Sequence, residues 1–197
     1  MVKTMPSNSK KKTPIVGMGI DPGLASTGMA IVEKRGTELT LKILAMVETK
    51  KATKKELRST RVSGDDQRRI REYWNIGLQL VQQHNVQTIG VESYAPIPGQ
   101  AGGGSWKTAQ VYQAMICLGW STGTFVVPFR PGDIKSRFLG KNSGTKIEVQ
   151  TVIESIVPGM SATMDRYKQG KHEHLSDAVG HAILAVEEFD RIRKLLA

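Results

Sequence analysis

The chain has 197 residues and a formal net charge of +10, with 28 Lys and Arg against 18 Asp and Glu. Its hydrophobic fraction of 39% is ordinary for a soluble globular protein. No apolar run approaches the ~20 residues of a membrane span, and no secretory signal is evident. The single cysteine, Cys117, excludes an intramolecular disulfide, and its apolar neighbours predict a buried thiol. We therefore expect a cytoplasmic protein, with a nucleic-acid partner favoured by its positive charge.

The first third of the chain predicts a basic arm followed by an antiparallel meander. Residues 1–13 are rich in lysine and contain no acid, which is typical of a flexible arm, and we expect a single domain over residues 14–197. Three strands are predicted over residues 15–20, 28–33 and 39–47. A charged loop over residues 50–61 then leads to a helix over residues 67–84, which we expect to start at Asp65 and Asp66.

The remainder of the chain alternates between strands and helices. We predict strands over residues 88–91 and 124–127 and helices over residues 106–118, 133–139, 146–156 and 172–196. Three segments are expected to be irregular: residues 96–105, which are rich in Gly and Pro, the turn 128–132, and residues 158–169. This order predicts an α/β fold with a mixed five-stranded sheet, whose first three strands are antiparallel, and with helices on both faces.

Two acidic residues follow predicted strands directly. Asp21 ends the apolar run 15–20 and precedes Pro22 and Gly23, and Glu92 ends the run 88–91. Functional groups in open α/β sheets tend to lie where strands finish. His174 and Asp177 are three residues apart in the last predicted helix, so their side chains project from neighbouring parts of one face. These groups can share one site only if the fold brings their segments together.

Carboxylates and imidazoles of this kind are suited to metal-dependent hydrolysis of a phosphodiester. Two divalent ions about 4 Å apart can activate water and neutralise the charge of the phosphoryl group. Asp21, Glu92 and Asp177 are suitable ligands for Mg²⁺, and His174 can serve as a ligand that suits Mn²⁺ or as a general base.

Ordinary roles are also open for the same residues. An Asp before Pro-Gly is often only a turn residue, Glu92 can be a solvated acid, and Asp177 can complement a helix dipole. His172 and His181 are interpreted as surface or partly buried polar residues, because no cysteine pair accompanies them to form a zinc site.

Four motifs, in order, resemble those of the RuvC-type Holliday-junction resolvases of the RNase H-like, or retroviral-integrase, superfamily. The first is Gly19-Ile20-Asp21-Pro22-Gly23 followed by Thr27-Gly28, and the second is Val91-Glu92. The third runs from Pro131-Gly132-Asp133-Ile134-Lys135 through Gly140 to Lys146 and Val149-Gln150, and the fourth is His174-Leu175-Ser176-Asp177-Ala178. Each motif alone is weak, but their order over residues 15–185 is specific.

The resemblance implies a homodimeric, Mg²⁺-dependent endonuclease that resolves four-way DNA junctions by paired symmetric nicks. Mn²⁺ is expected to substitute, with two ions in each active site. Asp21, Glu92, His174 and Asp177 would be the metal and catalytic residues, and Lys135 and Lys146 would lie near the scissile phosphate, where a cation stabilises developing charge. The DNA contacts that we expect come from Tyr94, Trp106, Lys107, Lys135, Arg137, Lys141 and Lys146.

The chain departs from the family pattern at one position. Relatives carry an aromatic residue three positions beyond the second acid, where this chain has Ala95, so stacking on a base is assigned to Tyr94 or Trp106. The basic arm and the loop 50–61 are expected to widen the range of branched substrates through phosphate contacts. A set of apolar residues can form either a dimer interface or core: Trp106, Tyr112, Ile116 and Trp120.

Three alternative functions share some of these signals. The opening motif also resembles the phosphate loop of sugar kinases and actin-like ATPases, but those need two such domains and this chain is too short. A non-catalytic protein that binds branched DNA would need only the basic surface. A related nuclease with broader branched substrates, or one acting on an RNA–DNA hybrid, would use the same acids.

Overall fold

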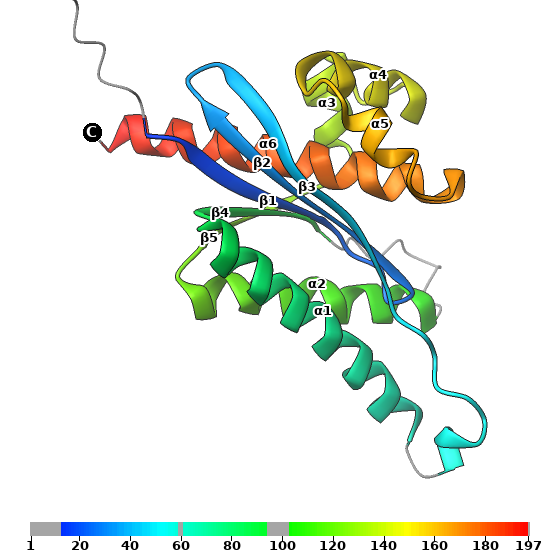
Figure 1. The fold of residues 1–197 in the computed structure, drawn as a ribbon. Helices are drawn as coiled ribbons and strands as arrows, with labels where there is room; N and C mark the ends of the chain where they lie inside the picture. The colour runs from blue at the N-terminus through cyan, green and yellow to red at the C-terminus, as the bar shows by residue number, and fades with distance from the viewer. Residues whose placement is uncertain (1–12, 59–60, 94–102, 197) are drawn as a thin grey trace, which may run out of the picture.

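The computed structural model describes residues 13–58, 61–93 and 103–196. Its strands are β1 (Ile15–Asp21), β2 (Ser26–Arg35), β3 (Glu38–Glu48), β4 (Thr88–Glu92) and β5 (Phe125–Phe129). Its α-helices are α1 (Val62–His84), α2 (Gly103–Thr122), α3 (Asp133–Leu139), α4 (Lys146–Ile156), α5 (Met160–Met164) and α6 (His172–Leu195), and two 3-10 turns are η1 (Glu56–Arg58) and η2 (Gln169–Lys171). Figure 1 shows their arrangement.

The five strands form one sheet in the order β3-β2-β1-β4-β5. The pairs β1–β2 and β2–β3 are antiparallel, whereas β4 runs parallel to both β1 and β5. The predicted mixed sheet is therefore confirmed. The prediction of a turn over residues 128–132 is wrong at its start, because Pro128 lies within β5 opposite Val91. An edge strand tolerates proline because its free side needs no backbone donor.

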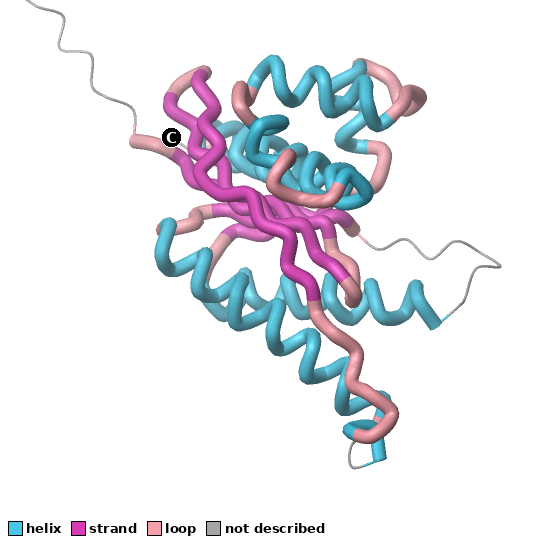
Figure 2. The backbone as a smooth tube through the Cα atoms, turned by 45° about the vertical axis from the view of Figure 1, so that its right-hand side comes forward, coloured by secondary structure: helices cyan, strands magenta, loops and turns pink. Residues whose placement is uncertain are grey.

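Helices cover both faces of the sheet, as predicted, and each face buries its own apolar cluster. Helices α1 and α2 lie against one face, and α6 crosses the other with α3, α4 and α5 outside it (Figures 1 and 2). The first cluster centres on Met18, Tyr73 and Leu118, and the second on Ile153 and Leu175. No helix in the described ranges is both long enough and apolar enough to cross a membrane.

Several predicted boundaries are wrong because tertiary contacts override local preference. Helix α1 begins at Val62, so Asp65 is not at its start but lies inside the first turns with its carboxylate accepting the Ala52 amide at 3.1 Å. Helix α2 includes Gly103 and Gly104, which composition assigned to a loop.

Cys117 is only partly buried, and its sulfur accepts a contact from Gln113.

A short helix, α5, also occurs where residues 158–169 were predicted to be irregular. Met160 and Met164 are fully buried in the apolar cluster that α5 shares with α6. Packing, rather than intrinsic helix propensity, therefore stabilises this segment. The Glu154 carboxylate accepts the amides of Gly159 and Ser161 at 2.9 and 2.7 Å, which satisfies the start of the helix.

Helix α6 approaches the sheet at backbone distance because the strands beneath it carry glycine. A Cβ atom added to Gly19 would lie 1.9 Å from the carbonyl oxygen of Ala178, and one added to Gly28 would lie 2.3 Å from that of His174. At Gly90 the corresponding distance, to the carbonyl oxygen of His181, is 2.3 Å. Any side chain at these positions would push the helix away. The glycines therefore set the height of α6 above the ends of β1 and β4.

We expect Gly19→Ala to destabilise the protein by about 1–3 kcal/mol or more, because overpacking moves backbone rather than a flexible side chain. Urea unfolding measures this change. Gly170→Ala is the matched control, because nothing lies within 4 Å of a Cβ at that position. Equal stability of the two variants would contradict the close approach.

Candidate active site

The ends of β1 and β4 place two carboxylates side by side. Ile20 pairs with Val91 in parallel register, so Asp21 and Glu92 are the next residues along adjacent strands. Asp21 is 6% exposed. The turn after it is closed by Thr27, whose hydroxyl donates to the Gly23 carbonyl at 2.8 Å and accepts the Gly23 amide at 3.3 Å. Two hydrogen bonds between Thr27 and Gly23 therefore hold the turn that follows Asp21.

The first two turns of α6 bring an imidazole and a third carboxylate to the same place. His174 Nδ1 and Asp21 Oδ2 share a hydrogen bond of 2.5 Å. The His174 side chain keeps 40% of its surface exposed, so its ring is open to solvent on one side. Asp177, one turn further along α6, is partly buried. The four predicted residues thus converge from three elements that are far apart in the sequence.

Mutual repulsion and burial disfavour negative charge on two of the three acids. Burial raises the pKa of Glu92 to about 8, with the Asp21 charge and a hydrogen bond to Asp21 adding to the effect. Burial, followed by the charge of Asp21, likewise raises the pKa of Asp177 to about 6. The hydrogen bond to Asp21 raises the pKa of His174. The cluster therefore carries more carboxylate than its own surroundings neutralise.

Two lysines border the acids from the helices α3 and α4. Lys146 is the first residue of α4, whose start is fixed by a capping box between Thr145 and Glu148. It forms an ion pair with Glu173, and its charge lowers the pKa of both Glu92 and Asp177. Lys135 on α3 has the same effect on Asp177. Glu173 was not among the predicted site residues, and no motif in its neighbourhood marks it as one.

A groove runs from the acids between α4 and the start of α6. It encloses about 510 Å³ and includes Asp177 and Lys146 in its walls, together with Gln150, Thr151 and His172. A larger cavity of about 670 Å³ lies at the opposite end of the sheet, beside Lys34 and Asp190, and holds none of the predicted site residues. Because Asp177 and Lys146 line it, the groove is a candidate path for a polymer bound beside the acids.

The donor set fits a divalent cation in its chemistry. Carboxylate oxygens and an imidazole nitrogen are ligands that Mg²⁺ or Mn²⁺ accepts, and a cation would offset the repulsion that raises the pKa of Glu92. Asp21 contacts both His174 and Glu92, and among the described residues no group of three or more His, Cys, Asp or Glu is arranged so that it could hold a metal ion. Asp21, Glu92, Asp177 and His174 are the residues that would hold such an ion.

The other predicted DNA contacts lie on α2, on α3 and in the connection after α3. Trp106 is 67% exposed and Lys141 is exposed. Lys107 pairs with Asp66 at 2.9 Å, and Arg137 makes two hydrogen bonds to Glu187, of 2.8 and 2.6 Å. These assignments stay predictions. Tyr94, Ala95 and most of the basic arm lie outside the described residues.

The two other histidines of α6, His172 and His181, differ in burial. His172 is partly buried and its Nε2 lies 3.1 Å from the Tyr167 carbonyl, which agrees with the interpretation as a polar structural residue. His181 is fully buried, so the prediction of a surface or partly buried residue is wrong. Its ring stacks on Phe129, and neither ring nitrogen has a hydrogen-bond partner within the described part of the chain. Burial lowers its pKa to about 4.

Comparison with known proteins identifies the family. The model of the crossover junction endodeoxyribonuclease RuvC family matches residues 17–184, which include all four converging residues. The chain belongs to this family. No relative was found among curated protein sequences.

Solved structures of RuvC-type resolvases share the fold of this family member. Thermus thermophilus RuvC in complex with a Holliday junction substrate has a TM-score of 0.64 and 20% identity, covering 85% of this chain and 90% of that one. A second Thermus thermophilus RuvC structure gives 0.63 and 20%, covering 85% and 91%. The yeast mitochondrial Holliday junction resolvase gives 0.58 and 12%, covering 84% and 76%. This RuvC-family chain therefore has the RNase H-like fold.

In EDTA, we expect the stability of the wild-type protein to fall as the pH rises from about 4.5 to about 8 through the titration of Glu92. The folded state keeps the Glu92 proton up to a pKa of about 8, whereas the unfolded state releases it near 4.5, so rising pH favours unfolding. Glu92→Gln removes this component, and Mg²⁺ should raise the wild-type melting temperature more than that of the variant. Thermal unfolding across this pH range measures both effects.

Glu38→Gln is the matched control, since Glu38 is an exposed acid at the start of β3, at the opposite end of the sheet. The control should keep the wild-type pH dependence and the wild-type response to Mg²⁺. A Glu92→Gln protein that responds to pH and Mg²⁺ as the wild type does would remove Glu92 from the cluster.

Proposed function

We propose that this junction-resolving endonuclease cuts opposing strands of a four-way DNA junction by Mg²⁺-dependent hydrolysis, at a site formed by Asp21, Glu92, His174 and Asp177. The observation that carries the proposal is the convergence of three carboxylates and an imidazole at one end of the sheet, in a chain of the RuvC family. Resolvases of this family depend on divalent metal ions in general. The choice of Mg²⁺, the presence of two ions and the paired symmetric nicks are the parts that we add.

Each residue has a definite chemical task in this proposal. A bound divalent ion supplies an activated water and neutralises charge on the phosphate. Asp21, Glu92 and Asp177 provide the negative charge that such an ion requires, and Asp21 also orients His174 through their shared hydrogen bond. The solvent-exposed side of the His174 imidazole can bind an ion or accept a proton from the attacking water.

Lysines on the rim complete the proposed site. Lys146 is close enough to influence Glu92 and Asp177, and its side chain is 55% exposed. A phosphate that enters the groove would compete with Glu173 for this ammonium group. In that position Lys146 would stabilise the charge that develops on the phosphoryl oxygens. Lys135 would add a second positive charge on the side of Asp177.

We further propose that two copies of the chain assemble through α2. Trp106 and Trp120 are 67% and 69% exposed, whereas Ile116 of the same helix is buried in the core. The two tryptophans are 14 residues apart, which is close to four helical turns, so they lie on one face of α2. Exposed large apolar side chains aligned on one face are typical of an interface. A two-fold dimer would offer two active sites to a substrate of nearly two-fold symmetry.

Asp21→Asn is expected to keep the affinity for a four-way junction and to lose Mg²⁺-dependent nicking. The substitution removes a ligand charge and weakens the charge-assisted hydrogen bond that orients His174, but leaves the basic surface unchanged. Gel-shift titration in EDTA and cleavage of a mobile junction with Mg²⁺ or Mn²⁺ measure the two properties separately. A wild-type protein that binds junctions but cuts none with either ion would show that the chain is only a binding protein.

Trp106→Ser with Trp120→Ser is expected to shift the protein from dimer to monomer, because the change removes the largest apolar side chains exposed on α2. Sedimentation velocity over a range of concentrations measures the shift. Leu195→Ser is the control, since Leu195 is 72% exposed at the end of α6. Monomeric wild-type protein, or a dimer that survives both tryptophan changes, would rule out this interface.

A further inference from the structure

A basic projection leaves the same end of the sheet as the active site. It consists of the connection after β3 and the first turns of α1, residues 50–58 and 61–71, and it extends away from the body of the molecule (Figures 1 and 2). Strand β3 runs in the same direction as β1, since both are antiparallel to β2. The chain therefore leaves β3 and enters the projection at the same end of the sheet as Asp21 and Glu92.

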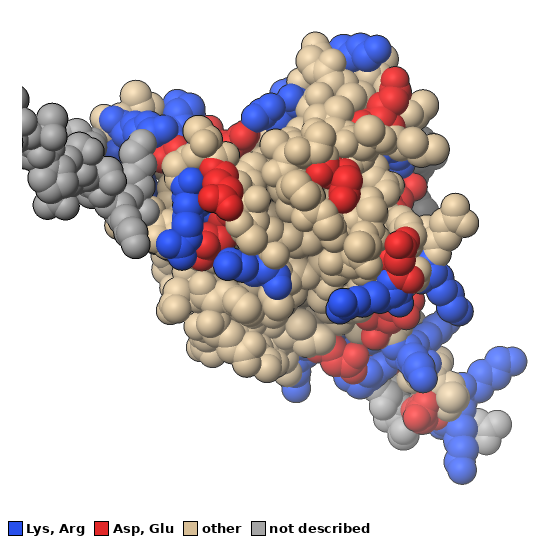
Figure 3. All heavy atoms as spheres, turned by 45° about the horizontal axis from the view of Figure 1, so that its top comes forward, with Lys and Arg blue, Asp and Glu red and all other residues tan. Residues whose placement is uncertain are grey.

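Four lysines on the projection have no partner of opposite charge. Lys50, Lys51, Lys54 and Lys55 are all exposed, and none makes an ion pair with another residue in the described ranges. Figure 3 shows Lys and Arg side chains gathered on the part of the molecule that projects at the lower right. Four such charges within six residues repel one another, and a polyanion would relieve that repulsion.

The acidic residues in and next to the projection have partners among neighbouring groups, and Asp66 pairs with Lys107 of α2 at 2.9 Å. Asp65 is 2% exposed, and its carboxylate accepts the Ala52 amide at 3.1 Å and two hydrogen bonds from Arg68, of 3.1 and 2.7 Å. Glu72 pairs with the same Arg68. Glu56 accepts both the amide and the hydroxyl of Thr53, at 2.6 and 2.7 Å. The acids thus fold the segment, while the lysines face outward.

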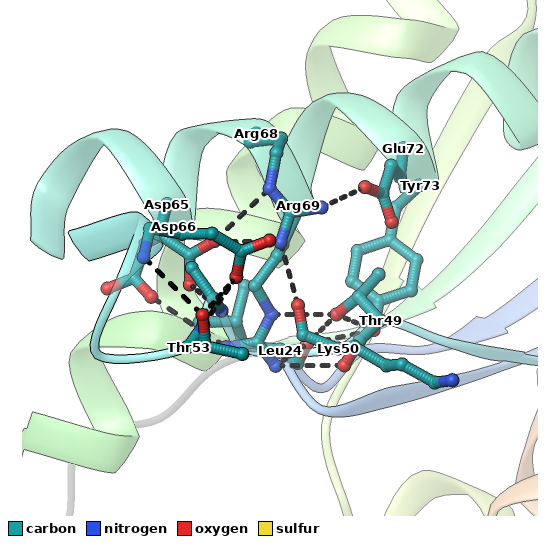
Figure 4. Close-up of polar contacts among 12 residues, drawn as sticks. Leu24, Thr49, Lys50, Thr53, Asp65, Asp66, Arg68, Arg69, Glu72 and Tyr73 are labelled. Carbon is teal, nitrogen blue, oxygen red and sulfur yellow. Dashed lines mark hydrogen bonds and ion pairs between the residues drawn. The ribbon is translucent and has the colours of Figure 1, made fainter. Parts of the chain in front are cut away.

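A buried polar network fastens the projection to the turn that follows Asp21. Arg69 is 6% exposed and donates to the Leu24 carbonyl and to the Thr49 hydroxyl, both at 2.8 Å. The Tyr73 hydroxyl donates to the same Leu24 carbonyl at 2.9 Å (Figure 4). Leu24 is only three residues beyond Asp21. The position of the lysines is therefore fixed relative to the active site, which an unattached charged loop would not achieve.

We infer that the basic projection is a second DNA-contact surface, which holds the phosphate backbone of one junction arm while another part of the junction occupies the active site. This inference rests on the proposed function. Lysine acts on phosphate as a point charge and reads no base, so the contact adds affinity and orientation without sequence preference. The groove beside Asp177 and the projection share no residue, and the Arg69 network joins the projection to the turn after Asp21.

The salt dependence of junction binding tests the inference. We compare wild-type protein with the variant that combines Lys50→Ala, Lys51→Ala, Lys54→Ala and Lys55→Ala, using a four-way junction in EDTA so that no cleavage occurs. A plot of the logarithm of the binding constant against the logarithm of the salt concentration has a negative slope, to which each phosphate contact contributes about −0.9. Loss of four contacts should therefore make the slope shallower by about 3.6. With Mg²⁺ and saturating junction, the cleavage rate of the variant should remain within about twofold of wild type.

Two control variants separate a local contact from a change in net charge. Arg35→Ala, Arg191→Ala, Arg193→Ala and Lys194→Ala together remove four exposed positive charges at the opposite end of the sheet, and this variant should keep a slope within about one of wild type. Exchanging the four projection lysines for arginine keeps the charge and should keep the slope. Circular dichroism checks that all variants are folded.

Two results would overturn the inference: a wild-type slope for the four-alanine projection variant, or an equal loss of slope in the variant from the opposite end. The binding slopes are independent of catalysis. A wild-type protein that binds junctions without cutting them would therefore refute the proposed nuclease activity and still leave the role of the projection decided by the slopes.

Discussion

The close contact between α6 and the sheet is the constraint on which the site depends. Gly19, Gly28 and Gly90 present bare backbone to the helix, and the residues of α6 nearest to them include Ala178 and Ala182. Because no side chain separates the two layers, the first turn of α6 lies within hydrogen-bonding distance of the end of β1. The 2.5 Å contact between His174 and Asp21 is a direct result. A helix held further away by ordinary side chains would leave its imidazole and carboxylate beyond reach of the strand ends.

The same packing brings three carboxylates close together, so that their negative charges repel one another. Three carboxylates are gathered where water is partly excluded, and burial together with the charge of Asp21 raises the pKa of Glu92 to about 8. Charge is expensive under these conditions unless a cation is present. Lys146 offsets only part of the excess, since it also pairs with Glu173. The fold thus gathers carboxylates whose mutual repulsion a bound cation would relieve.

Acidic and basic side chains are arranged differently at the active site and on the basic projection. At the site, acids face one another and lysines stand at the rim. On the basic projection the arrangement is reversed, because Asp65 and Glu72 are turned toward Arg68 while four lysines face outward. Arg69 connects the two regions through the backbone of Leu24. This distribution gives a branched polyanion two separate places to bind, in keeping with the inference that the projection holds one junction arm.

By itself, the sequence determined the sheet, most helices and the four residues that could share a site. Alternation and apolar runs placed all five strands, and α3 and α4 have the predicted bounds because clear turn residues flank them. Local preference failed at Gly103, at Pro128 and at Met160, where tertiary packing or an edge position decides the conformation.

Only the tertiary structure decided that Asp21, Glu92, His174 and Asp177 meet, that Lys146 pairs with Glu173, and that Arg69 ties the basic projection to the turn after Asp21. The physical reason is that periodicity and propensity are properties of neighbouring residues. Distances between separate segments of the chain are set by how the layers of the fold pack.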